Sequence, residues 1–273
     1  MTSQMLQVRV EARRMYRRPA CALVLVLAAA FPLLPLLLAA VGSTQTVLGS
    51  QEVTAFAESS GLSFTTFTFL LAGQLVVPTV AAYFFGESLA RDAEWGSLRS
   101  LIVAGASRGR ILEVKALCAA AATGVVIVGC AVTTLAVGVL FYGSGSLDAP
   151  GNSSIAFGPG VGRVGLMVLT MLLCNLWIAA LAFLLSAWSH GNPLTAVGGP
   201  LMVLLISHLL GTFPGLGYAR DFLPTRSHGT WMVWAYDPVP TDILSWGVFV
   251  SVLYAALFGI AAVVAFQTRD ISA

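Results

Sequence analysis

The sequence is poor in charge. Only 10% of its 273 residues are Asp, Glu, Lys or Arg, and the formal net charge is +2. So small a net charge does not indicate binding to nucleic acid. With 58% hydrophobic residues and a mean hydropathy of +0.88, the chain has too little polar surface to fold around an apolar core in water. We therefore expect it to be an integral membrane protein with the lipid bilayer as its solvent.

The chain also lacks the common catalytic motifs. Its single lysine, Lys115, follows Val114, so the sequence holds no G-x-x-x-x-G-K-[ST] phosphate loop. It has no H-E-x-x-H and no G-x-S-x-G, and its three histidines lie on different segments. The four cysteines fall in apolar runs without metal-ligand spacing or a disulfide pattern. We expect no enzymatic activity, no metal site and no cofactor bound by this chain.

What the sequence does contain is long apolar runs. Six of them can each cross a hydrocarbon core of ~30 Å at ~1.5 Å per residue. Strands of a membrane barrel would be shorter and would alternate in polarity. The sequence predicts an all-α fold of six transmembrane helices in one domain, residues 1–273. The predicted spans are about 20–41, 62–86, 116–142, 164–187, 194–213 and 244–266.

Basic residues indicate the orientation of these spans. Eleven Lys and Arg residues lie in 1–18, 87–115 and the C-terminal tail, whereas three lie in the segments on the other side. Because cytoplasmic loops are enriched in Lys and Arg, both termini are predicted to be cytoplasmic. The preference for Arg over Lys and for Ala, Gly and Val indicates a GC-rich bacterial genome, so we expect a bacterial plasma membrane.

Residues 1–19 are predicted to form a helix on the inner membrane surface. Helical spacing separates an apolar face from a basic face. The apolar face holds Met5, Val8, Ala12, Met15 and Tyr16, and the basic face holds Arg9, Arg13 and Arg17. A basic tail that only sets topology is a compatible alternative.

Two outer segments differ in character. Residues 142–163 are rich in Gly, Ser and Pro and are typical of a flexible connector. Residues 214–243 mix Pro, Gly and charge with Trp231, Trp234 and Tyr236. Aromatic residues of this kind favour the headgroup level, so the segment either dips into the outer leaflet or forms an exposed loop.

Three polar side chains lie inside the predicted spans: Gln74, Asn175 and His208. Polar groups are costly in lipid and usually face a bundle interior or a transport pathway. Each can equally form an interhelical hydrogen bond that only holds the bundle together.

The charge that is present is concentrated in one window. Residues 87–116 carry nine of the charged side chains, between segments that are almost purely apolar. Glu87 and Arg91 form an i,i+4 pair, and Leu98, Leu101 and Ile102 form a one-sided apolar stripe. Gly96 is expected to loosen the middle of this charged segment, and Gly105 is expected to end it. Ser107 can cap the helix that follows. These features favour a cytosolic element that charges lock to the ends of two spanning helices. The alternative is a solvated loop whose arginines only set the topology.

The order E-x6-E-x-G-S-L-R, then S-R and a Lys seven residues later, resembles the first cytoplasmic loop of type-2 ABC export permeases. One departure is "AGAS" where that family often has a "PVS" turn. Together with Arg91, the matching residues are the candidates for ATPase coupling. They are Glu87, Glu94, Gly96, Ser97, Leu98, Arg99, Ser107, Arg108 and Lys115.

This resemblance implies that 87–115 is a coupling helix seated in a groove of a separate ATPase subunit. Two permeases, identical or homologous, and two ATPases would form the transporter, with ATP and Mg bound by the ATPases. Spans two and five commonly line the dimer interface in that family. Gln74 and His208, and with less reason Asn175, thus become candidate pathway residues.

The expected function is the membrane subunit of an ATP-driven exporter; export as opposed to import rests on the resemblance alone. A lipid-like or amphipathic drug-like substrate is expected, because no charged cavity and no large outer domain are evident. The alternative is a stand-alone secondary transporter or an intramembrane enzyme. A secondary transporter would be expected to carry ionisable groups within its spans, where only His208 is found.

The missing phosphate loop generates a first prediction. The purified chain should show no ATPase activity by itself and should show it only with a partner ATPase, as measured by phosphate release. Robust ATP turnover by the chain free of other proteins would contradict this prediction.

Overall fold

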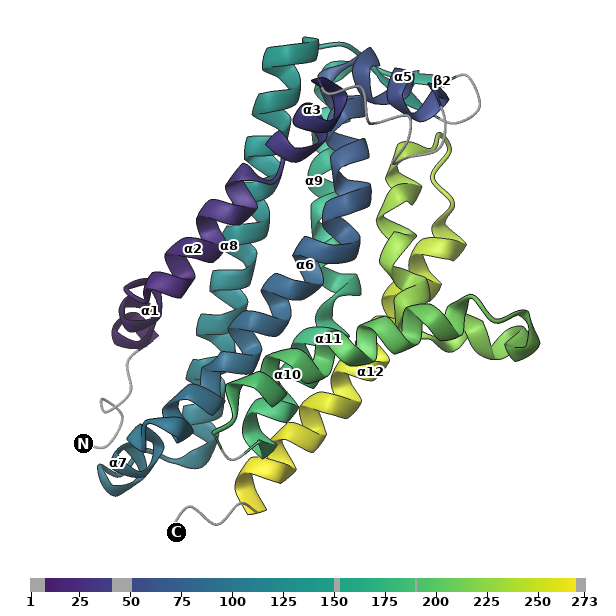
Figure 1. Ribbon diagram of the computed structural model, residues 1–273. Coiled ribbons are helices and arrows are strands. Elements are labelled where there is room, and N and C mark those ends of the chain that lie inside the picture. The colour runs from purple at the N-terminus through teal and green to yellow at the C-terminus, as the bar shows by residue number, and fades with distance from the viewer. Residues whose placement is uncertain (1–7, 41–50, 150–152, 190, 269–273) are drawn as a thin grey trace.

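The computed structural model describes residues 8–40, 51–149, 153–189 and 191–268 (Figure 1). Its elements in chain order are α1 (Val8–Tyr16), α2 (Pro19–Ala30), α3 (Leu33–Ala40), α5 (Gln51–Ser59), α6 (Gly61–Glu94), α7 (Ser97–Val103), α8 (Arg108–Tyr142), β1 (Leu147–Ala149), β2 (Ser153–Ile155), α9 (Phe157–Cys174), α10 (Leu176–Trp188), α11 (Pro193–Gly211), η1 (Pro214–Phe222), η2 (Pro224–Ala235) and α12 (Thr241–Thr268).

Within the described ranges, five helices are long and apolar enough to cross a membrane. They are α6, α8, the continuous pair α9–α10, α11 and α12. They coincide with five of the six predicted spans, and the protein is a helical membrane protein. The pair α9–α10 is offset at Asn175, whose φ of −100° and ψ of 4° interrupt the helix without ending it.

The first predicted span, 20–41, differs from expectation. It consists of α2 and α3, which meet at a turn at Phe31 and Pro32, and residue 41 lies outside the described ranges. Proline cannot donate the helical hydrogen bond and its ring clashes with the preceding turn, so a break here is expected. At 12 and 8 residues, neither helix alone has the length of a span.

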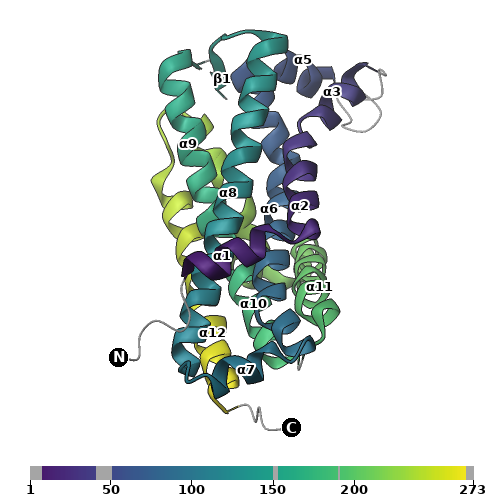
Figure 2. The same ribbon diagram turned by 90° about the vertical axis from the view of Figure 1, so that its left-hand side faces the viewer.

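The helices form an upright bundle in which α6, α8 and α9 lie side by side (Figures 1 and 2). Helix α2 lies along α8, and α10 packs against both α6 and α12. Helix α6 is the most central element, because buried residues occur along almost its whole length. Large buried side chains such as Trp177, Met167 and Met171 fill the space around it.

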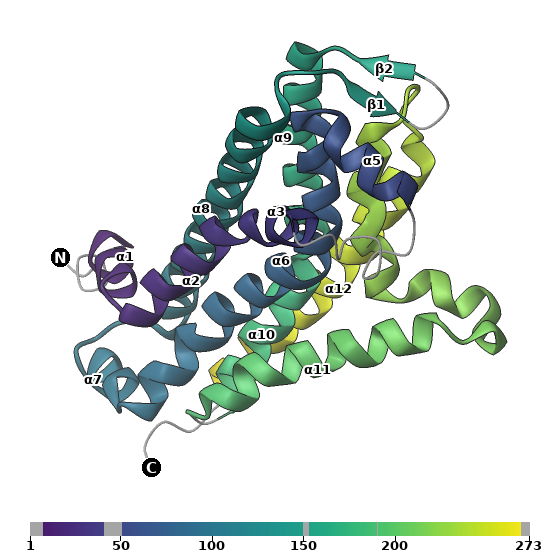
Figure 3. The same cartoon turned by 45° about the horizontal axis from the view of Figure 1, so that its top comes forward.

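The outer segments are more ordered than predicted. Instead of a flexible connector throughout, 142–163 contains an antiparallel β-hairpin in which Leu147 pairs with Ile155 (Figure 3). Leu147 is fully buried, so an apolar anchor holds this hairpin on the bundle.

The 214–243 segment divides into two parts. Each residue of η1 is described and none is buried, whereas η2 packs against α9 and α12 and buries Trp231. The exposed-loop alternative is therefore wrong for η2, which packs against the bundle.

At the opposite end of the bundle, α1 lies across α8, and α7 lies beyond it near the end of α12 (Figure 2). The predicted loop 87–115 is shorter than expected, because α6 continues to Glu94 and α8 already begins at Arg108. Only 95–107 lies outside the two long helices. We call these residues, with α7 at their centre, the α7 segment.

Candidate functional site

The α7 segment connects α6 to α8 through two residues with a left-handed backbone. Gly96 has φ 66° and Gly105 has φ 88°, which only glycine adopts at little cost. Gly105 ends the segment as the sequence predicted, whereas Gly96 precedes α7 instead of loosening its middle. Ser107 accepts a hydrogen bond from the backbone N–H of Arg110 and so caps α8, which confirms the predicted cap.

Helix α7 has a buried face and an exposed face. Leu98 is buried, and Leu101 and Ile102 are half-buried against the inner-end core that contains Leu89 and Ile111. The predicted apolar stripe therefore fastens α7 to its own bundle.

The other face presents apolar and acidic side chains to solvent. Val103 is 81% exposed and Trp95 is 60% exposed, and Glu94 beside them is also exposed. The side chain of Arg99 lies outside what the structure describes. Val103 on α7 and Trp95 at the end of α6 are therefore large apolar side chains exposed at this tip of the bundle.

Several contacts tie this tip to the long helices. Arg91 donates to Glu87 at 2.6 Å, which confirms the predicted i,i+4 pair. Ser97 donates to the backbone carbonyl of Asp92 at 3.1 Å. Arg108 donates to the backbone carbonyls of Phe266 and Gln267 and so joins the start of α8 to the end of α12.

Lys115, one of the candidate coupling residues, is buried inside the structure. It is 1% exposed and lies between Asp92 of α6 and Glu11 of α1. Its Nζ donates to Glu11 Oε1 at 2.6 Å and to Asp92 Oδ2. We call Glu11, Asp92 and Lys115 the ionic triad.

Two arginines of the N-terminal segment surround the triad. Arg14 and Arg18 lie 3.9 Å and 3.7 Å from Asp92 Oδ1, an oxygen that has no hydrogen-bond partner among the described residues. The guanidinium groups of Arg18 and Arg91 lie 6.0 Å and 5.8 Å from the centroid of the Trp95 ring. Cation–π contact thus links the surroundings of the triad to the α7 segment.

The triad fixes α1 to the bundle. Glu11 and Met15 are spaced by one helical turn and both are buried, so this edge of α1 faces α8. In the predicted interfacial helix, Arg9, Arg13 and Arg17 are exposed as expected. Met15 of the predicted apolar face is buried, and Met5 lies outside the described ranges.

Sequence reasoning missed Glu11 and Asp92 as structural residues. A signal was present for each. Glu11 is the only acidic residue before Glu52 and stands among five arginines, and Asp92 lies 23 residues before the only lysine. An isolated acid in a basic segment and a lone lysine in an apolar chain are each costly to bury unpaired, so each required a partner.

The predicted pathway residues separate into two groups. His208 Nε2 and Gln74 Oε1 lie 2.8 Å apart, which brings these two together at half-buried positions. The His208 ring also contacts the ring of buried His228, which accepts a hydrogen bond from Trp177 at 3.0 Å. A polar chain therefore joins α6, α11, η2 and α10.

Asn175 does not join that chain. It is buried at the α9–α10 junction, where its amide donates to the carbonyl of Met171 at 2.8 Å. Its Oδ1 has no hydrogen-bond partner within the described part of the chain. These contacts place Asn175 at the helix interruption, apart from the Gln74–His208 pair, and its role as a pathway residue stays a prediction.

Comparison with known families gives one result. Residues 36–272 match the model of a protein family of unknown function, DUF2705, and the chain belongs to that family. No curated protein matches it.

The ionic triad generates a stability prediction. Replacing Lys115 with Met would leave two buried carboxylates without their close cation. Breaking a buried ion pair costs ~3–5 kcal/mol, and we expect Lys115→Met to lower the free energy of unfolding by about this amount. Denaturant unfolding of the purified protein in detergent measures it.

Arg110→Met is the matched control, because it breaks a 2.9 Å pair with Glu113 in which both side chains are exposed. We expect a loss below ~1 kcal/mol there. Equal stability of the two variants would show that the triad contributes no more than a surface pair.

The Gln74–His208 contact generates a second stability prediction. Gln74→Leu and His208→Leu, combined in a double-mutant cycle, should give a coupling energy of about 0.6 kcal/mol, the usual size within membrane bundles. Asn175→Leu combined with His208→Leu should be additive, since no hydrogen bond joins those residues. If the effects were additive for both pairs, the Gln74–His208 hydrogen bond would make no measurable contribution to the stability of the bundle.

Proposed function

We propose that this chain is the membrane-spanning permease subunit of an ATP-driven ABC exporter. Two permeases, identical or homologous, would form the substrate pathway, and two separate ATPase subunits would bind and hydrolyse ATP with Mg. The observation that supports this most is α7, a short helix at one end of the bundle with an apolar exposed surface. In this assignment the α7 end faces the cytoplasm of a bacterium.

The position of α7 relative to the membrane surface supports a docking role. Because α1 is a basic amphipathic helix, it marks the level of the lipid headgroups. Lys115 contacts α1, and Arg108 lies seven residues earlier on α8. At ~1.5 Å per residue α8 therefore continues about 10 Å beyond that level. The α7 segment stands in the aqueous phase, where a soluble partner can reach it.

The same contacts supply a route for mechanical coupling. Leu98 fastens α7 to the bundle, Ser97 ties it to the end of α6, and Arg108 ties α8 to α12. A partner that displaced Val103 and Trp95 would move the ends of three long helices together. In this proposal Glu94 and Trp95 bind the ATPase, and Glu87, Arg91 and Lys115 brace the helices that transmit the displacement.

The proposed pathway follows α6 and α11. Helix α11 is poorly covered in a single chain, with Met202, Leu205 and Leu209 each more than half exposed. Gln74 and His208 lie at the edge of that surface, where a second permease would enclose them. We propose a lipid-like or amphipathic substrate for this pathway, because apolar side chains dominate the surface.

One observation favours the alternative, a stand-alone secondary transporter. Such proteins use buried acidic residues to bind a coupling ion, and the ionic triad contains two. However, ion sites of that class usually lie near the midplane between repeats. The triad lies at the inner ends of α6 and α8 with Lys115 occupying its centre, which suits a brace better than an ion site.

The docking surface provides the test of the exporter proposal. Val103→Asp should weaken binding of a soluble ATPase that co-purifies with the tagged wild-type chain. Loss of one apolar anchor at the centre of an interface costs ~2 kcal/mol or more, about 30-fold in Kd. Binding is measured with the chain in lipid nanodiscs, and transport per ATP is measured in proteoliposomes.

Leu140→Asp is the matched control, since Leu140 is also 81% exposed but lies at the opposite end of α8. It should leave ATPase binding unchanged. A Val103→Asp chain that binds the ATPase and transports as the wild type does would refute the docking role of α7, as would failure to recover any ATPase with the wild-type chain.

A further inference from the structure

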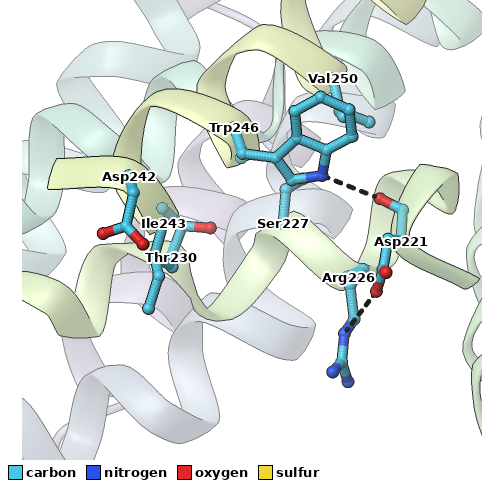
Figure 4. A pocket seen from close by; sticks show the side chains of 9 residues that line it. Asp221, Arg226, Ser227, Thr230, Asp242, Ile243, Trp246 and Val250 are labelled. Atoms are coloured by element: carbon cyan, nitrogen blue, oxygen red, sulfur yellow. Dashed lines mark hydrogen bonds and ion pairs between the residues drawn. The ribbon is translucent and has the colours of Figure 1, made fainter. Parts of the chain in front are cut away.

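A pocket of about 390 Å³ lies between η1, η2 and the start of α12 (Figure 4). Its size falls within the ~300–1,000 Å³ typical of small-molecule sites. Its wall combines an indole, hydroxyl groups and charged side chains, among them those of Asp221, Arg226, Thr230, Asp242, Trp246 and Val250. The pocket is distinct from the α7 segment, the ionic triad and the Gln74–His208 pair.

The spacing of the α12 residues explains one wall. Asp242, Trp246 and Val250 recur every four residues, so they lie on one face of α12. Gly247 lies beside Trp246, and a Cβ atom there would collide with Thr230 of η2. The glycine therefore allows η2 to approach α12 closely and to close the floor of the pocket.

Some charged side chains of the pocket are ion-paired, whereas another has no such partner among the described residues. Arg226 lies 3.9 Å from Asp221, and the Trp246 indole donates to the Asp221 backbone carbonyl at 3.3 Å. Asp242 has no ion pair with any other described residue, and its carboxylate lies on the side of the pocket away from the Arg226 guanidinium (Figure 4). The Asp242 carboxylate thus remains available, beside an indole that is 43% exposed and packs against the rings of Phe222 and Phe249.

We propose that this pocket binds an organic ammonium cation that carries an apolar body. The carboxylate of Asp242 would balance the positive charge, and the Trp246 ring would attract it by cation–π interaction, the usual mode for quaternary ammonium groups. Ile243 and Val250 would contact the apolar body. The ammonium group could belong to a free solute or to a lipid headgroup.

This inference concerns binding by the chain alone. Only its extension, that such a cation is the transported substrate, rests on the proposed function. Because the pocket is remote from α7, binding of the cation can be tested without any ATPase. Failure of the pocket and failure of the exporter assignment are therefore separate results.

The experiment uses benzyltrimethylammonium and the full chain in nanodiscs of phosphatidylglycerol, which has no ammonium group. We expect saturable binding by calorimetry and much weaker binding of benzenesulfonate, a probe of similar size and opposite charge. Asp242→Asn should weaken the Kd about five- to tenfold, and Trp246→Leu by at least about threefold. Both residues are exposed, so neither change should prevent folding.

Asp148→Asn is the control, since it removes the same charge from the exposed hairpin strand β1 and should leave the Kd unchanged. With the phosphatidylglycerol fraction held constant and a neutral glycolipid replaced by phosphatidylcholine, so that the surface charge does not change, weakened binding supports a lipid headgroup as the occupant and unchanged binding supports a free solute. The site is refuted if the ammonium probe does not bind saturably, if benzenesulfonate binds equally well, or if Asp242→Asn and Asp148→Asn behave alike.

Discussion

The contact of Lys115 with Glu11 and Asp92 is the constraint on which the inner end of the molecule depends. A buried ammonium group is tolerated only when carboxylates replace the water that it loses. The two carboxylates come from α1 and α6, while the lysine comes from α8. One ion cluster therefore sets the position of the surface helix and the relative height of the two helices that carry the α7 segment.

This constraint divides the charged window into two populations. Glu87, Asp92 and Lys115 are buried and hold the chain's own helices, whereas Glu94, Arg110 and Glu113 remain exposed. A loop that only set topology would need the arginines but not the buried acids. The buried set makes the tip rigid with respect to the bundle, and the exposed set leaves its outer surface open to a partner.

Features that depend on neighbouring residues could be predicted from the sequence. Five spans were found because apolar length is a local property, and the Gly105 and Ser107 boundaries were found because backbone conformation and capping are local as well. The triad was not found, because Lys115 is separated by 104 residues from Glu11 and by 23 residues from Asp92. No local pattern in these segments indicates which residues pair. The break at Phe31–Pro32 is local too, because it follows from the proline. Burial of η2 could not be predicted, because it depends on the space between α9 and α12.

The two ends of the protein use charge in opposite ways. At the α7 end, carboxylates are paired with cations inside the structure, which fixes α1, α6 and α8 to one another. At the outer end, α12 begins beside η2 with Asp242 unpaired among the described residues, close to an exposed indole. Because α12 also meets Arg108 at its inner end, a single rigid helix joins the α7 segment to the outer pocket. Displacement of that end of α12 would therefore shift Asp242 and Trp246 relative to η2 and change the shape of the pocket.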